Sequence, residues 1–71
     1  NKKDLEEKNL NTVILLNPLN EEAIYSLAEL KLNQSDFEGS NKLIDQLTGI
    51  CHSYCLKSKE LKAEIEKSLK K

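Results

Sequence analysis

Apolar residues recur along this chain at intervals of three and four positions, which is the period of an α-helix with one buried face. Three such segments are separated by short polar breaks, and a lysine-rich segment follows them. The pattern predicts four helices, which cover Asp4–Leu16, Glu21 to about Leu32, Phe37 to about Ile50, and about Ser53–Leu69. Scarce aromatic residues, two glycines and one proline favour the same all-α class.

Polar residues in the breaks predict where the helices begin and end. Pro18 disfavours the α conformation at Asn17 and has no N–H to donate, so the first helix should stop there. Asn20 and Asp36 each precede an apolar segment and have side-chain oxygens that can accept a backbone N–H bond. They are therefore the expected N-caps of the second and third helices.

The apolar stripes of the second and third helices face each other in the simplest packing of the chain. We expect Leu27 and Leu43 to lie in the shared interior of these two helices. A chain of 71 residues has room for one domain and only a small core. The prediction is thus a single domain of marginal stability.

The charge pattern excludes some classes of partner. The chain has 11 basic and 12 acidic side chains, and every basic one is Lys. Without Arg it lacks the bidentate donors that favour phosphates and guanine edges, so nucleic acid is not an expected partner. No apolar run approaches the ~20 residues that span a bilayer, and the first residues do not have the apolar core of a signal peptide. We expect a soluble chain with no membrane contact.

The order of loop, capped helix, turn and second helix resembles the tetratricopeptide repeat. Leu27–Ala28 stands where that family has a Leu–Gly pair, and Asp36–Phe37 stands where it often has Asp–Tyr. Ile24 takes the place of a bulky apolar residue, and Ser40 that of a small residue at the helix crossing. With a Pro–x–Asn exit of a preceding repeat upstream, the resemblance covers about residues 5–50.

The resemblance implies an α-solenoid of antiparallel helical hairpins, with residues 1–71 forming one domain. Residues 1–17 would be the second helix of a preceding repeat, residues 20–52 one full repeat, and residues 53–71 a C-terminal capping helix. Ser35 stands where the family favours Gly, and no proline announces a following repeat. These departures indicate that the array ends here.

The same resemblance implies a protein-binding scaffold that takes part in complex assembly. In the family, the first helix of each repeat lines a concave groove for a peptide or helix of another protein. Carried over residue by residue, this face consists of Glu22, Tyr25, Ser26, Glu29, Leu32 and Asn33. Because Glu22 and Glu29 would repel a C-terminal carboxylate, the carboxylate clamp of some family members is not expected, and a basic or amphipathic partner suits the face better.

Cys51, His52 and Cys55 form the only cluster with the chemistry of a metal ligand or a nucleophile. A closed zinc site needs four ligands, and a thiolate–imidazole nucleophile needs a third group that orients it. We therefore expect no metal, no cofactor and no enzyme activity. Both cysteines should pack as small apolar residues with free thiols in a reducing cytoplasm, since a disulfide would require the chain to leave regular helix there.

Two other interpretations stay open. The chain could be an architectural segment that self-associates, or joins a larger complex, through the apolar outer side of its first helix. It could also be the helical tail of a thioredoxin-like holdase, which would require a Cys–x–x–Cys unit upstream. A measurement of molecular size separates the first of these from peptide binding.

Overall fold

The computed structural model describes residues 2–69, and over these residues it contains four α-helices and no strand. The helices are α1 (Lys2–Leu16), α2 (Glu21–Asn33), α3 (Phe37–Ile50) and α4 (Cys55–Leu69). The all-α prediction is confirmed, although α1 begins at Lys2 rather than Asp4 and α4 at Cys55 rather than Ser53. Within the described residues, no helix combines the length and the apolar character that crossing a membrane requires.

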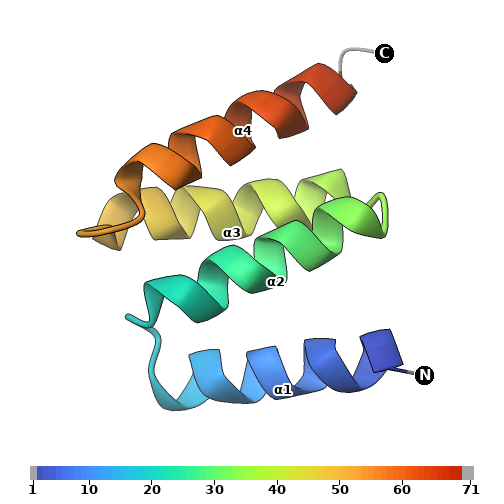
Figure 1. The fold of residues 1–71 in the computed structure, drawn as a ribbon, viewed down its shortest axis with the longest axis vertical. Coiled ribbons are helices and arrows are strands. Elements are labelled where there is room, and N and C mark those ends of the chain that lie inside the picture. The colour runs from blue at the N-terminus through green and yellow to red at the C-terminus, as the bar shows by residue number, and fades with distance from the viewer. Residues whose placement is uncertain (1, 70–71) are drawn as a thin grey trace.

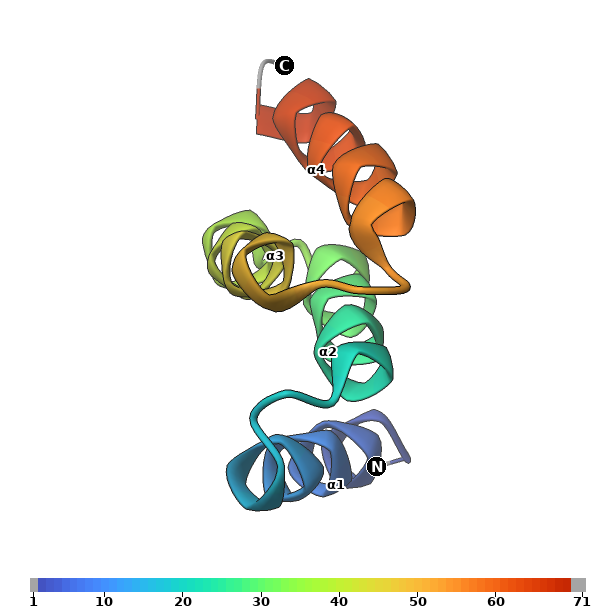
Figure 2. The ribbon, with the colours of Figure 1, turned by 90° about the vertical axis from the view of Figure 1, so that its left-hand side faces the viewer.

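Each helix packs antiparallel to the one that precedes it in the chain, and the helices follow one another across the molecule in sequence order (Figure 1). The molecule is flat, with extents of 33 × 32 × 14 Å. Seen on edge, α3 lies to one side of the line that runs from α1 through α2 to α4 (Figure 2). Because α3 is displaced in this way, α2 and α4 also contact each other directly.

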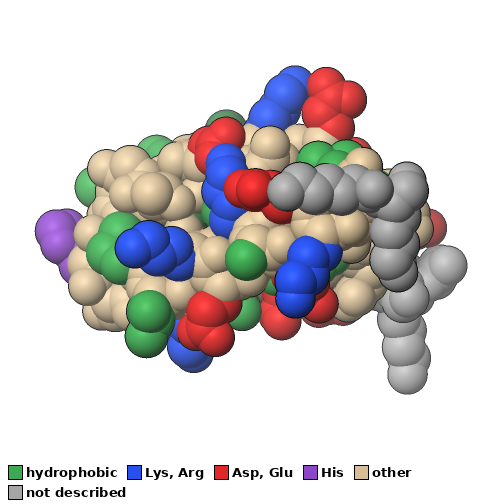
Figure 3. All heavy atoms as spheres, turned by 90° about the horizontal axis from the view of Figure 1, so that it is seen from above, with side chains coloured by type: hydrophobic (Ala, Val, Ile, Leu, Met, Phe, Trp, Pro, Cys, Tyr) green, Lys and Arg blue, Asp and Glu red, His purple; other side chains and the backbone are tan. Residues whose placement is uncertain are grey.

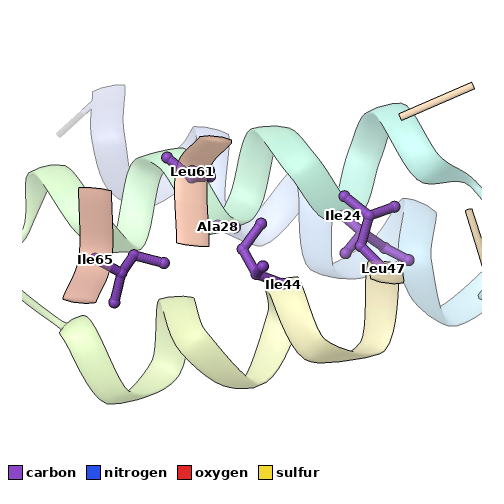
Figure 4. Close-up of a cluster of buried hydrophobic side chains, with 6 residues drawn as sticks. All are labelled: Ile24, Ala28, Ile44, Leu47, Leu61 and Ile65. Carbon is purple, nitrogen blue, oxygen red and sulfur yellow. The ribbon is translucent and has the colours of Figure 1, made fainter. Parts of the chain in front are cut away.

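The hydrophobic core lies where α2, α3 and α4 meet (Figure 4). It consists of Ile24, Ala28, Ile44, Leu47, Leu61 and Ile65. Leu27 is only 3% exposed, as expected, but lies outside this cluster on an adjacent stripe of α2. Leu43 is half-buried and packs against the edge of the cluster. The burial expected of Leu27 is therefore confirmed, but the interior that α2 and α3 share does not include Leu27 and has Leu43 only at its edge.

Small side chains allow the core helices to approach closely. Ala28 of α2 and Ser40 of α3 are completely buried, and the Ser40 hydroxyl donates a hydrogen bond of 2.7 Å to the Ala28 carbonyl. On the other side of α3, the hydroxyl oxygens of Thr48 and buried Ser58 lie 2.6 Å apart. These bonds satisfy polar groups that would otherwise be costly to bury, so they fix how α3 sits between α2 and α4.

Both predicted N-caps are confirmed. The Asn20 side chain accepts the Ala23 N–H at 3.1 Å, and the Asp36 carboxylate accepts the Gly39 N–H at 3.0 Å. A Cβ atom on Gly39 would lie 2.6 Å from the Asp36 carboxylate, so a glycine at this position lets the cap close. Ser35, just before this cap, has a φ of 64°, a left-handed backbone that glycine adopts more readily than other residues.

We expect Leu27→Ala to destabilise the domain by about 2–5 kcal/mol, because it removes buried methyl groups and leaves a cavity. That loss would unfold much of a domain this small. A thermal melt followed by circular dichroism measures it. Leu56→Ala is the matched control, since Leu56 is 71% exposed and its truncation should leave the midpoint nearly unchanged. Equal midpoints for the two variants would contradict the packing described above.

Candidate functional site

The six residues predicted to bind a partner divide into an exposed ridge and its inner edge. Glu22, Glu29 and Asn33 are exposed and Ser26 is half-buried, and their spacing places all four on one side of α2. Tyr25 and Leu32 are half-buried and pack against the core cluster. Four of the six residues therefore share one side of α2, whereas Tyr25 and Leu32 are anchored toward α3 and α4.

Tyr25 forms an aromatic pair with Tyr54, which precedes α4. The ring centroids lie 5.5 Å apart and the ring planes are inclined by 46°, a tilted arrangement typical of stable aromatic pairs. The Lys57 ammonium lies 5.0 Å from the centroid of the Tyr54 ring, within the range of a cation–π contact. The pair thus links α2 to the first turn of α4.

Carboxylates of two helices lie near enough to Tyr25 to act on it electrostatically. Burial, and then the negative charges of Glu29, Glu60 and Glu64, raise the pKa of Tyr25 above its ordinary value. A phenol is a protonated hydrogen-bond donor at neutral pH even with its ordinary pKa, and this shift moves its ionisation further from neutrality. We define the α2–α4 face by the residues that meet here, which are Tyr25, Glu29, Tyr54, Lys57, Glu60 and Glu64.

Four members of the α2–α4 face were not predicted from the sequence. Lys57, Glu60 and Glu64 follow one another at intervals of three and four, so they share one side of α4. That spacing is visible in the sequence, but it does not show which helix lies opposite. Tyr54 is half-buried against the core and also contacts Tyr25.

The outer side of α4 has a different character. Viewed from this side, lysine side chains, acidic side chains and single hydrophobic side chains are interspersed (Figure 3). On the side toward α3, Lys62 pairs with Asp45 of α3. This surface is typical of a solvated helix face, which leaves the α2–α4 face as the stronger candidate for a site.

A single carboxylate holds the joint between α3 and α4. Oε1 of Glu21, in the first turn of α2, accepts the backbone N–H groups of His52, Ser53 and Tyr54 at 2.7, 3.1 and 3.1 Å. The hydrogen bond from His52 is the main cause that lowers the pKa of Glu21 below its ordinary value, against an opposing effect of burial. Glu21 therefore caps the N-terminus of α4 from another helix and positions Tyr54.

Cys51 and Cys55 are joined by a disulfide, so the prediction of two free, packed thiols is wrong. A bridge between these cysteines requires the chain to leave regular helix, and it does so here. Helix α3 ends at Ile50, His52–Tyr54 form a bend and α4 begins at Cys55. The Cα atoms lie 5.2 Å apart, within the usual range for a bridge. With both sulfur atoms bonded to each other, neither can act as a thiolate ligand or nucleophile. A disulfide also fits poorly with the expected reducing compartment.

The disulfide gives a first prediction for this joint. After purification in air without reductant, the denatured protein should show no titratable thiol, and two after reduction. Reduction should lower stability by about 2 kcal/mol, because a closed loop this short removes little entropy from the unfolded chain. The double variant Cys51→Ser/Cys55→Ser should melt at the same temperature with and without reductant. Two titratable thiols in the untreated protein would contradict the bridge.

The Glu21 cap gives a second prediction, which concerns pH. A lowered pKa in the folded state means that the ionised carboxylate stabilises the fold above its ordinary pKa and that this contribution is lost as the pH falls through the folded value. Glu21→Gln should therefore lower the melting midpoint at pH 7, and the difference from the wild type should shrink below about pH 4. Glu22→Gln, one residue along and exposed, serves as the control. A deficit of Glu21→Gln that stays constant down to pH 2 would refute a role for the charge.

No protein-family model, curated protein or solved structure matches this chain. The candidate site is accordingly described by its own geometry, an aromatic pair bordered by three carboxylates from two helices.

Proposed function

We propose that the chain is a protein–protein interaction module and that its α2–α4 face binds a basic or amphipathic segment of another protein. The observation that carries this proposal is the Tyr25–Tyr54 pair, together with Glu29, Glu60 and Glu64 of helices α2 and α4, whose charges act on Tyr25. Aromatic rings supply contact area at low conformational cost, and the carboxylates select for positive charge. Binding requires no cofactor and no catalytic group.

Several features support the finer assignment to a tetratricopeptide-like α-solenoid. The helices form successive antiparallel pairs, and α2 and α4 contact each other with α3 displaced to one side (Figure 2). The contact between α2 and α3 at Ala28 involves Ser40, the small residue that the resemblance places at the helix crossing. In this proposal α2 and α3 form the full repeat, α1 belongs to a preceding one and α4 is the cap.

The charge of the face defines the kind of partner. The three carboxylates attract Lys or Arg side chains and repel a terminal carboxylate, so the face favours an internal basic segment over a free C-terminus. Lys57 above the Tyr54 ring shows that the ring accepts a cation, and a Lys or Arg of the partner could take that place. The half-buried Leu32, at the inner edge of the ridge, offers apolar contact to an amphipathic helix.

The proposal can be tested with a designed peptide. The probe is a helical peptide of about 18 residues with Leu on one side, Lys on the other and no aromatic residue. Because the chain has two tyrosines and no tryptophan, and both tyrosines lie in the face, tyrosine fluorescence reports binding at the site. We expect the Lys peptide to bind in a salt-dependent way and a matched peptide with Glu in place of Lys not to bind.

A pair of charge-matched variants locates the binding surface. Glu29→Lys/Glu60→Lys should weaken binding by more than about tenfold, since it places two repulsive charges in the face. Glu38→Lys/Glu66→Lys changes the net charge equally at exposed positions outside the face, and should bind like the wild type. Equal losses in both variants would mean that only net charge matters, and an unaffected face variant would refute the site.

A further inference from the structure

The first helix has one neighbour and one uncovered side. Among the described residues, α1 contacts only α2. Its half-buried positions are Glu7, Leu10 and Ile14, and the Lys31 ammonium of α2 lies 3.4 Å from the Glu7 carboxylate. These positions mark the side of α1 that faces α2.

The opposite side of α1 carries a short stripe that we call the outer stripe, made of Leu5, Asn9, Thr12 and Leu16. At about 100° per residue these four side chains lie within one narrow sector, on the side away from Leu10 and Ile14. All four are exposed, with Leu5 at 61% and Leu16 at 80%. Leu5 and Leu16 stand at the two ends of this sector with the two polar residues between them, and no other described helix packs against α1 on this side.

The outer stripe is complementary to itself. Its spacings are four, three and four, so reversing the helix direction reproduces the same positions. In an antiparallel pair of α1 helices about a two-fold axis, Leu5 faces Leu16 of the other copy twice, and Asn9 faces Thr12 twice. The leucines bury each other at both ends, and an amide meets a hydroxyl at the centre. The Thr12 hydroxyl donates to the Lys8 carbonyl at 3.0 Å, which leaves its oxygen free to accept from an Asn9 amide.

We infer that the outer stripe of α1 is a two-fold dimer interface whose partner is a second copy of this chain. A closed, isologous contact needs one patch that is complementary to itself, and the 4–3–4 stripe provides it. The stripe itself carries no charge, which suits a second copy better than the basic segment proposed for the α2–α4 face. The central polar pair fixes register and direction, as polar residues do in helix pairs with otherwise apolar seams.

The size of the stripe predicts how strong the dimer is. A helix of 15 residues is about 22 Å long, so one helix pair buries an area at the low end of specific interfaces. We therefore expect a reversible dimer with a Kd on the order of 100 µM. Sedimentation equilibrium of the 71-residue chain from about 10 µM to 1 mM covers this range.

A charge swap tests the pairing directly. Leu5→Lys and Leu16→Glu, made singly, should each weaken the dimer by more than about tenfold, because each change places a charge against a leucine at both ends. The double variant Leu5→Lys/Leu16→Glu should recover dimerisation, since antiparallel pairing sets each new lysine against a new glutamate. Leu5→Glu/Leu16→Glu should stay monomeric. All four variants change only the exposed positions 5 and 16, and unaltered melting curves at low concentration would show that the monomer still folds.

Other occupants of the stripe give different results. Leu56→Glu, on the exposed side of α4, should dimerise like the wild type, and its dissociation would indicate a head-to-tail contact between α1 and α4 instead. A double charge-swap variant that stays monomeric would overturn antiparallel pairing, and so would a wild-type chain that remains monomeric at 1 mM. Because Leu5 and Leu16 lie outside the α2–α4 face, binding of the Lys peptide should be retained in every variant of this set. A failure of peptide binding would therefore count against the proposed function alone. The dimer is tested separately, by sedimentation.

Discussion

The close approach of α2 and α3 at Ala28 and Ser40 is the constraint on which the remaining structure depends. Both residues are completely buried, and the hydroxyl of one is bonded to the carbonyl of the other. A larger side chain at either position would push the helices apart and open the core that Ile44 and Leu47 fill from α3. With α3 seated against α2, Ile65 of α4 packs into the same cluster, so one crossing constrains the spacing of three helices. A chain of this size has little other core to compensate for an error there.

The position of α4 depends on a second, polar constraint at the joint between α3 and α4. Three successive N–H groups converge on one oxygen of Glu21, and the Cys51–Cys55 bridge limits the ends of the same bend. Tyr54 is the last of those donors and also a member of the aromatic pair. The geometry of the α2–α4 face therefore depends on the geometry of this joint, because Tyr54 belongs to both. Changes at Glu21 or at the disulfide can alter a partner's contacts without touching the face itself, which is why the variants proposed for binding leave the joint intact.

Local features of this fold could be predicted from the sequence, and contacts between distant residues could not. Pro18, Asn20 and Asp36 act on their immediate neighbours, so the helix ends near them follow from backbone sterics and capping. The buried stripe of α2 follows from its period. By contrast, the backbone N–H groups that Glu21 accepts lie more than thirty positions away in the chain. The residues next to Glu21, and those in the bend, do not indicate that the two segments meet. The same holds for Glu60 and Glu64, whose meeting with Tyr25 depends on how α4 crosses α2. The disulfide was not predicted because a reducing compartment was expected, and because a bridge at this spacing requires the chain to leave regular helix, as it does at His52–Tyr54.

The two proposed contacts use different chemistry on different helices, and this difference has a physical consequence. The α2–α4 face relies on carboxylates, so its affinity should fall as salt screens them. The outer stripe of α1 relies on leucines and a neutral polar pair, whose contribution salt does not screen. A dimer formed through α1 would present two acidic faces at a fixed separation. A partner with two basic segments could then bind both, with an effective concentration for the second contact that does not depend on its own abundance. Weak self-association through α1 would in this way strengthen weak binding by the α2–α4 faces. The outer stripe, which salt does not screen, would hold together two faces whose affinity salt reduces.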